Sequence, residues 1–133
     1  MKILSPVKLP NDHNIFFFGD KHDGSVLSCD KGWAKLIDLM LSEYDGCKNN
    51  YGAEGGDMIE AIMADDPRFS PEKLSEALPL EQQKMAVKRH EPIKHILLDI
   101  LLGNHERKLW RFGDLAKDIA DDLVCLMELI LLN

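Results

Sequence analysis

The chain has 133 residues, of which 45% are hydrophobic and 29% charged, and its formal net charge is −7. This length excludes two full domains, and the ordinary composition indicates a single globular domain over residues 1–133. The acidic charge argues against a protein that binds nucleic acid through a broad basic surface. It leaves nucleic acid open as a substrate, because bound divalent metals reverse the local charge.

The first predicted elements are a strand and a helix. The run NIFFFGD over residues 14–20 is short, apolar and aromatic, and Gly19 ends it, which is typical of a buried strand. Residues 30–44 carry apolar side chains at helical spacing, with Asp30 in place as the N-cap. We therefore expect a strand and then an amphipathic helix at the start of the fold.

The middle of the chain is rich in glycine and in turn-forming residues. Residues 45–57 predict a loop with at most a weak strand, and residues 58–64 predict one or two helical turns. The Ser70–Pro71 pair is typical of a helix start. Residues 80–91 favour a helix that Pro92 stops.

Two further elements follow. Residues 94–103 favour a second clear strand, although a short buried helix stays open because periodicity alone does not separate the two. Residues 114–132 carry apolar positions at helical spacing, with Asp114 as the cap, and predict a helix. The order strand, helix, weak strand, helices, strand and helix predicts an α/β fold with a mostly parallel sheet and flanking helices.

The cysteines and the chain ends indicate a cytoplasmic protein. Cys29, Cys47 and Cys125 are odd in number and widely spaced, so they form neither a C-x-x-C zinc site nor a disulfide framework. The amino terminus lacks the apolar core of a signal peptide. The apolar run over residues 123–132 contains Glu128 and is too short to span a bilayer, so we expect no membrane association.

Polar side chains of the kinds that bind metals follow both clear strands and the glycine-rich passage. Asp20 and His22 are two residues apart, so in an extended backbone they point the same way and can converge on one ion. Asp57 offers two oxygens that could bridge two ions, and Asn104 offers a neutral carbonyl oxygen. Because the carboxyl ends of parallel strands meet at one edge of a sheet, we expect these side chains to lie together there.

The motifs around these residues resemble those of the calcineurin-like metallophosphoesterase superfamily. That family shows D-x-H, then G-D-x-x-[DE], then G-N-H-[DE]. This chain shows DKH at 20–22, GDMIE at 56–60 and GNHE at 103–106. The resemblance covers about the amino-terminal half of the family fold. It implies a partial αββα sandwich whose carboxyl-terminal half is missing from this chain.

The resemblance also implies a divalent metal site, with two ions of Mn, Fe, Zn or Ni when the site is complete. Asp20 and His22 would hold the first ion, Asp57 would bridge both, and Asn104 would bind the second. The implied activity is hydrolysis of phosphate mono- or diesters by a metal-bridging hydroxide.

Further roles follow from the same resemblance. His105 would stabilise or protonate the leaving oxygen without binding metal, and Glu60 would orient its imidazole. Glu106 would fix the loop. Apart from the resemblance, Arg107 and Arg111 follow the third motif closely enough to contact a substrate phosphate, with pairing to the acids of the last helix as the alternative.

The chain departs from the family pattern after the third motif. The family's remaining ligands, a lone histidine and a G-H-x-H motif, lie downstream, whereas no histidine follows His105 here. The second metal would then keep only Asp57 and Asn104. A missing second sheet would also leave apolar surface bare, which predicts a homo-oligomer or a complementing chain over the missing half.

Two functions from different classes follow from these motifs. The first is a metal-dependent phosphoesterase, weakened by the missing ligands. The second is a degenerate, non-catalytic module that binds a metal or a partner. A third possibility is a plain α/β interaction domain. It would require all three motifs to have arisen by chance in the family's order. The choice between monoester, diester and nucleic acid as substrate stays open, because specificity depends on the surrounding loops.

Overall fold

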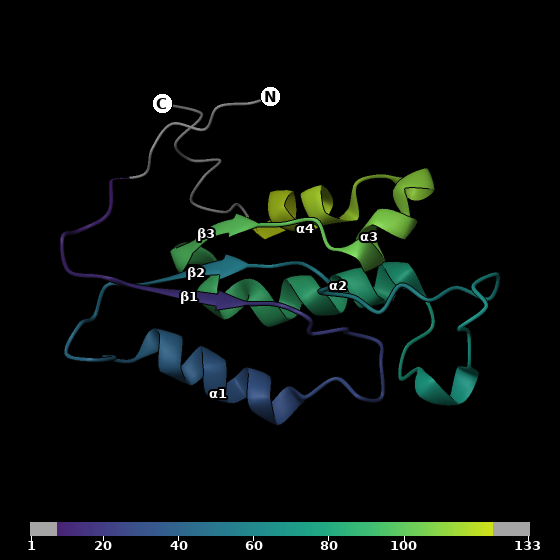
Figure 1. Cartoon of the computed structure of the whole chain (residues 1–133), viewed down its shortest axis with the longest axis horizontal. Coiled ribbons are helices and arrows are strands. Elements are labelled where there is room, and N and C mark those ends of the chain that lie inside the picture. The colour runs from purple at the N-terminus through teal and green to yellow at the C-terminus, as the bar shows by residue number, and fades with distance from the viewer. Residues whose placement is uncertain (1–7, 124–133) are drawn as a thin grey trace.

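The computed structural model describes residues 8–123 and shows a mixed α/β fold (Figure 1). The main elements, in chain order, are β1 (Asn14–Phe18), α1 (Asp30–Leu41), β2 (Asn50–Glu54), α2 (Pro79–His90), β3 (Leu97–Ile100), α3 (Asn104–Lys108) and α4 (Leu115–Leu123). Short 3₁₀ helices lie at Pro71–Lys73, Glu91–Ile96 and Trp110–Phe112.

The three-stranded sheet is parallel and has the order β1-β2-β3. β1 pairs with β2 from Asn14 opposite Asn50 to Phe18 opposite Glu54, and β3 pairs with the other side of β2. The predicted α/β fold with a parallel sheet and flanking helices is therefore confirmed. The glycine-rich passage supplies the central strand, where the sequence predicted at most a weak one.

One face of the sheet carries the helices. In Figure 1, α2 runs behind the strands, with α1 toward the β1 edge and α4 toward the β3 edge. Phe16 and Phe18 of β1 pack against the core, whereas Ile15 and Phe17 alternate with them and are exposed. Phe17 is 81% exposed, so no element within residues 8–123 covers the outer side of this strand.

A single hydrophobic cluster joins the helices to the sheet. Its buried members come from α1, α2 and α4, from the 3₁₀ helix before β3, from β3 itself, from the segment after β2 and from the residue that follows α3: Trp33, Met40, Met58, Ile59, Ala61, Ala86, Ile93, Leu97, Leu109, Leu115, Ile119 and Leu123. These side chains hold the strands and helices in one body, and the loops at the sheet edge rest on it.

A buried polar pair crosses this core. The Glu54 and His90 side chains are fully buried, with Glu54 Oε2 3.0 Å from His90 Nε2. Burial raises the pKa of the Glu54 carboxyl, and the hydrogen bond with His90 partly opposes that rise. Glu54 Oε1 also accepts the backbone N–H of Gly56 at 3.2 Å, so the pair connects α2 to the loop after β2.

The segment after β2 is not helical, and the prediction of helical turns over residues 58–64 is wrong. Its backbone pairs with the loop after β1. The Asp23 N–H donates to the Met58 carbonyl oxygen at 2.8 Å, and the Glu60 N–H donates to the Asp23 carbonyl oxygen at 2.9 Å. This pairing satisfies backbone N–H and carbonyl groups that a helix would satisfy internally. Contacts with the loop after β1 therefore override the helical preference of residues 58–64.

The first two helices largely follow the sequence. The N-cap of α1 is Cys29 rather than the predicted Asp30, and its Sγ accepts the Gly32 N–H at 3.3 Å. α2 confirms the helix predicted over residues 80–91. The predicted helix start at Ser70–Pro71 forms only a short 3₁₀ turn.

The last two predicted elements are shorter in the structure. The strand predicted over residues 94–103 is confined to β3, because a 3₁₀ helix precedes it. α4 confirms the start of the helix predicted over residues 114–132. The rest of that prediction, and Cys125, lie outside the described residues.

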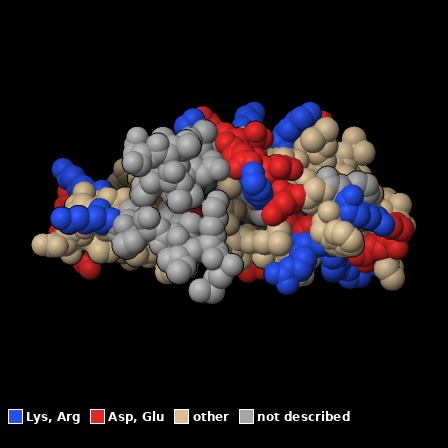
Figure 2. Space-filling model, turned by 90° about the horizontal axis from the view of Figure 1, so that it is seen from above, with Lys and Arg blue, Asp and Glu red and all other residues tan. Residues whose placement is uncertain are grey.

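The molecular surface mixes both signs of charge. Figure 2 shows Lys and Arg scattered among Asp and Glu on one face, with a group of acidic side chains near its middle. This fits the net charge of −7. None of the helices within residues 8–123 has both the length and the apolar character needed to cross a membrane.

Candidate metal centre

Loops after the three strands meet at one edge of the sheet, and they carry the three sequence motifs. Backbone hydrogen bonds join the first two loops. The Asp20 N–H donates to the Gly56 carbonyl oxygen at 3.0 Å. The His22 N–H donates to the Asp57 carbonyl oxygen, also at 3.0 Å. Segments that lie far apart in the sequence are therefore side by side at this edge.

The backbone is strained at three of the predicted metal ligands. Asp20, His22 and Asp57 have φ angles of 54°, 50° and 55°, in the left-handed region that residues other than glycine rarely adopt. Each such position costs on the order of 1–3 kcal/mol and persists only where the surroundings fix it. The hydrogen bonds between the loops fix it here, and strain held in this way is typical of functional sites.

Two motif glycines let the second and third loops approach closely. Gly56 has a φ of 92°, and a Cβ on it would lie 2.5 Å from the Gly103 nitrogen. A Cβ on Gly103 would lie 2.1 Å from the Asp57 nitrogen and 2.2 Å from Asp57 Oδ1. A side chain at either position would push the loops apart, so both glycines have a steric role.

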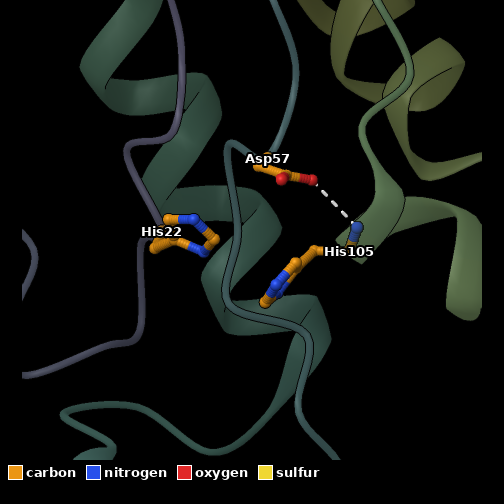
Figure 3. A group of neighbouring side chains, drawn as sticks. All are labelled: His22, Asp57 and His105. Atoms are coloured by element: carbon orange, nitrogen blue, oxygen red, sulfur yellow. Dashed lines mark hydrogen bonds between the residues drawn. The ribbon is translucent and has the colours of Figure 1, made fainter.

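His22, Asp57 and His105 form a group that could hold a metal ion (Figure 3). One ligand atom from each lies within 4.8 Å of the others, and the two imidazole rings meet edge to face with centroids 4.5 Å apart. Asp57 Oδ1 accepts the backbone N–H of His105 at 2.9 Å, which leaves Oδ2 without a hydrogen bond from the described residues. Two nitrogens and a carboxylate oxygen suit the divalent transition metals.

The His22 ring has a buried nitrogen that lacks a hydrogen bond. Nδ1 lies 3.1 Å from Glu60 Oε2 but makes no hydrogen bond with it or with any other described residue. Nε2 lies 3.8 Å from Asp20 Oδ1. Because buried polar atoms are nearly always satisfied, this nitrogen beside the Glu60 carboxylate fits a bound cation.

Glu60 contacts both histidines through different atoms. Its carbonyl oxygen hydrogen-bonds His105 Nδ1, so Nδ1 carries the proton, since a carbonyl oxygen only accepts. Nε2 of His105 is then the atom left to bind a metal or, when the ring is charged, to donate a proton. The orienting contact predicted for Glu60 is made by its backbone, and its carboxylate lies beside His22 instead.

Glu106 ties the second and third loops together. Its buried carboxylate accepts the backbone N–H groups of Asp57 and Gly103 at Oε2 and that of Ile59 at Oε1, each at 3.1 Å. Such a carboxylate holds its donors more strongly than a neutral acceptor would. The loop-fixing role expected for Glu106 agrees with these contacts.

Asn104 and Arg107 lie outside the histidine and aspartate group. Both are exposed on α3, and their side chains make no hydrogen bond or ion pair with the residues that the structure describes. Asn104 nevertheless starts α3 directly before His105. The cations that line the neighbouring cleft are Lys21, Arg68 and Lys73.

That cleft has a volume of about 730 Å³ and includes Asp20, His22, Glu60 and His105 in its walls. Arg68 and Lys73 were not among the site residues predicted from the sequence. Both lie between the second and third motifs, and no local pattern marks them. Only the fold brings them to the cleft.

An ion-pair network anchors the loop after β1. Lys21 is buried, with Nζ 3.1 Å from Asp23 Oδ1 and 3.1 Å from Asp30 Oδ1. Arg89 of α2 pairs with the same two carboxylates, at 2.7 Å and 2.9 Å.

The network also shifts the pKa values of its two acids. Burial raises the pKa of Asp23, while Lys21 and Arg89 oppose the rise. The hydrogen bond from Lys21 lowers the pKa of Asp30. The network fixes the strained loop against both α1 and α2.

Comparison with known proteins assigns no family to this site. The chain matches no protein-family model, no curated protein and no solved structure.

Proposed function

We propose that this protein is a metal-dependent phosphoesterase that hydrolyses phosphate mono- or diesters. The observation that carries the proposal is the convergence of His22, Asp57 and His105, with one ligand atom of each within 4.8 Å of the others. The motif resemblance to calcineurin-like metallophosphoesterases supports the same activity. The parallel sheet would then be part of an αββα sandwich.

The residues present fit a divalent cation. His22 and Asp57 would hold it, with Asp20 close to the His22 ring and the unsatisfied His22 nitrogen facing Glu60. Mn, Fe, Zn and Ni all suit this set of nitrogen and oxygen donors. A second cation would need Asn104 as well as Asp57, and Asn104 lies outside the group that the described residues form.

The reaction requires three events. Water adds to phosphorus and gives up a proton to the solvent, the bond between phosphorus and the ester oxygen breaks, and the leaving oxygen takes a proton. A bound cation would polarise a phosphoryl oxygen and neutralise part of its charge. His105 in its charged form would supply this proton from Nε2, while its Nδ1–H stays hydrogen-bonded to the Glu60 carbonyl oxygen and keeps the ring in place. The alcohol and the shortened phosphate then leave.

A second candidate is a non-catalytic module that binds a metal or a partner. The exposure of two predicted ligands favours it: the Asp20 side chain is 85% exposed, and Asn104 lies at the surface. A site that lacks these ligands would hold one ion without activating a phosphate ester. Turnover therefore separates the two candidates.

The test is manganese-dependent hydrolysis of bis-p-nitrophenyl phosphate and p-nitrophenyl phosphate by wild type and Asp57→Asn. Asparagine keeps the oxygen that accepts the His105 N–H and removes the charge, so the loops stay in place. We expect metal-dependent hydrolysis in the wild type and a loss of at least about 100-fold in the variant.

Asp38→Asn is the matched control, because Asp38 is exposed on α1 and is not among the side chains that line the cleft. It should hydrolyse both esters at the wild-type rate. Metal binding without turnover in the wild type would favour the non-catalytic module. Equal hydrolysis by wild type and Asp57→Asn would rule out this centre as the source of activity.

A further inference from the structure

The cleft beside the metal group has an apolar wall. Its apolar side chains come from β1, from the loop after β1, from α1 and from the segment after β2: Phe18, Leu27, Trp33, Leu36 and Ile62. Leu27 is 87% exposed. An isolated exposed leucine is ordinary, but Leu27 shares this wall with Trp33 and Leu36, so the apolar surface extends from the protein interior to the cleft mouth.

Lys73 supplies a positive charge next to this wall. The Val26 N–H donates to the Lys73 carbonyl oxygen at 3.0 Å, which places Lys73 beside the loop that carries Leu27. The Lys73 side chain makes no ion pair with the residues described by the structure. Arg68, by contrast, binds Asp66 through two nitrogens at 3.0 and 2.7 Å, so much of its charge is neutralised.

We infer that the substrate is a small phosphate ester with an apolar organic group. This inference rests on the proposed function and specifies its substrate class. The organic group lies against Leu27 and Leu36, the phosphorus lies at the metal group, and Lys73 pairs with an anionic oxygen. The cleft volume of about 730 Å³ is within the range of small-molecule sites, which combine apolar walls with a few polar groups.

The charge distribution favours a small molecule over nucleic acid. Nucleic acid binding depends on many contacts between phosphates and Lys or Arg. The chain has a net charge of −7, and the face in Figure 2 shows no continuous basic band. Among the described residues that line the cleft, Lys73 is the lysine without an ion pair, and one such charge suits a single anionic group better than a polymer of phosphates.

Binding of phenylphosphonate and methylphosphonate to the manganese-loaded protein tests this class by calorimetry. Neither probe has an ester bond to hydrolyse, so affinity is measured without turnover. We expect phenylphosphonate to bind at least tenfold more tightly than methylphosphonate. Leu27→Asn should remove most of this preference, and Lys73→Gln should weaken both probes several-fold.

Leu80→Asn and Lys88→Gln are the matched controls. Both residues are exposed on α2, and neither lines the cleft. They should bind both probes like the wild type. Equal affinity for the two phosphonates, no binding of either, or tighter binding of oligothymidylate that is insensitive to Leu27→Asn would overturn the inference.

The outcomes are separable from those of the proposed function. Hydrolysis that depends on Asp57 together with equal phosphonate affinities would reject only the substrate class. A preference for phenylphosphonate that requires Leu27, without any hydrolysis, would support the apolar wall as a ligand site and reject the esterase activity.

Discussion

At the scale of single residues, Glu106 is the side chain on which the site geometry depends most. Its carboxylate accepts three backbone N–H groups from two loops. Glu106→Gln places an amide NH₂ where an acceptor is needed, so at least one buried N–H loses its partner. We expect the free energy of unfolding to fall by about 1–3 kcal/mol, measured by urea denaturation.

Glu43→Gln serves as the control for this change. Glu43 is exposed and lies 3.8 Å from Lys48, an ordinary surface pair. Its replacement should leave the unfolding midpoint where it is. Equal midpoints for wild type and Glu106→Gln would mean that the Glu106 contacts do not hold the loops.

Glu54 gives the stability of the protein a pH dependence. Burial raises the pKa of its carboxyl above the 4.5 of the unfolded chain. The folded chain therefore keeps this proton to higher pH, so the stability from this group is full below pH 4.5 and is lost as pH rises through the folded-state pKa. Glu54→Gln removes this titration.

We expect the stability of the wild type relative to Glu54→Gln to decrease when the pH rises from 4.5 toward neutrality. Urea denaturation of both proteins at several pH values gives the difference directly. A difference that stays constant, or that increases with pH, would show that the folded protein does not raise the pKa of Glu54.

The sequence motifs identified most residues of the candidate site. They did not show which atoms of those residues make the contacts. Asp20, His22, Asp57 and His105 were found because the carboxyl ends of parallel strands share an edge. The contact of His105 with a backbone oxygen of Glu60 could not be predicted, since it depends on how the segment after β2 pairs with the loop after β1. Lys73 was missed because its place depends wholly on tertiary structure.

At the scale of elements, the approach of α3 to the loop after β2 requires a glycine. Gly103→Ala would place a Cβ 2.1 Å from the Asp57 nitrogen, so α3 must move away from the metal group. We expect manganese affinity to fall at least about tenfold and stability to fall by about 1–3 kcal/mol. Calorimetric titration and urea denaturation measure the two effects.

Gly46→Ala is the control for a glycine in a loop. Gly46 has a φ of 73°, but a Cβ there would meet no atom within 4 Å. This variant should lose some stability through backbone strain and keep the manganese affinity of the wild type. Unchanged affinity in Gly103→Ala would contradict the steric role of that glycine.

The elements themselves were predicted where periodicity is strong. β1, α1 and α2 follow from apolar spacing along the chain. β2 was underestimated because its sequence, NYGAE, has little strand preference and is fixed by neighbours on both sides. The helical turns expected over residues 58–64 fail for a similar reason, since backbone pairing with the loop after β1 decides that segment.

At the scale of the whole molecule, a bound metal should stabilise the fold. Because the ligands come from loops after different strands, an unfolded chain does not hold them together. At a manganese concentration of 100 times Kd, the gain is about 2.7 kcal/mol, which raises Tm by roughly 10 °C. Thermal unfolding with and without manganese measures the shift.

His22→Asn should lose this thermal shift, and asparagine tolerates the left-handed backbone at this position. His95→Asn, which changes an exposed histidine far along the chain, should keep it. Equal shifts in the two variants would place the bound manganese elsewhere.

The most direct test of a metal centre at the sheet edge is calorimetric titration of the metal-free protein with manganese. We expect at least one ion per chain in the wild type and in Asp38→Asn, and loss of that binding in His22→Asn and Asp57→Asn. Absence of binding to the wild type, or the same affinity in all four proteins, would contradict this expectation.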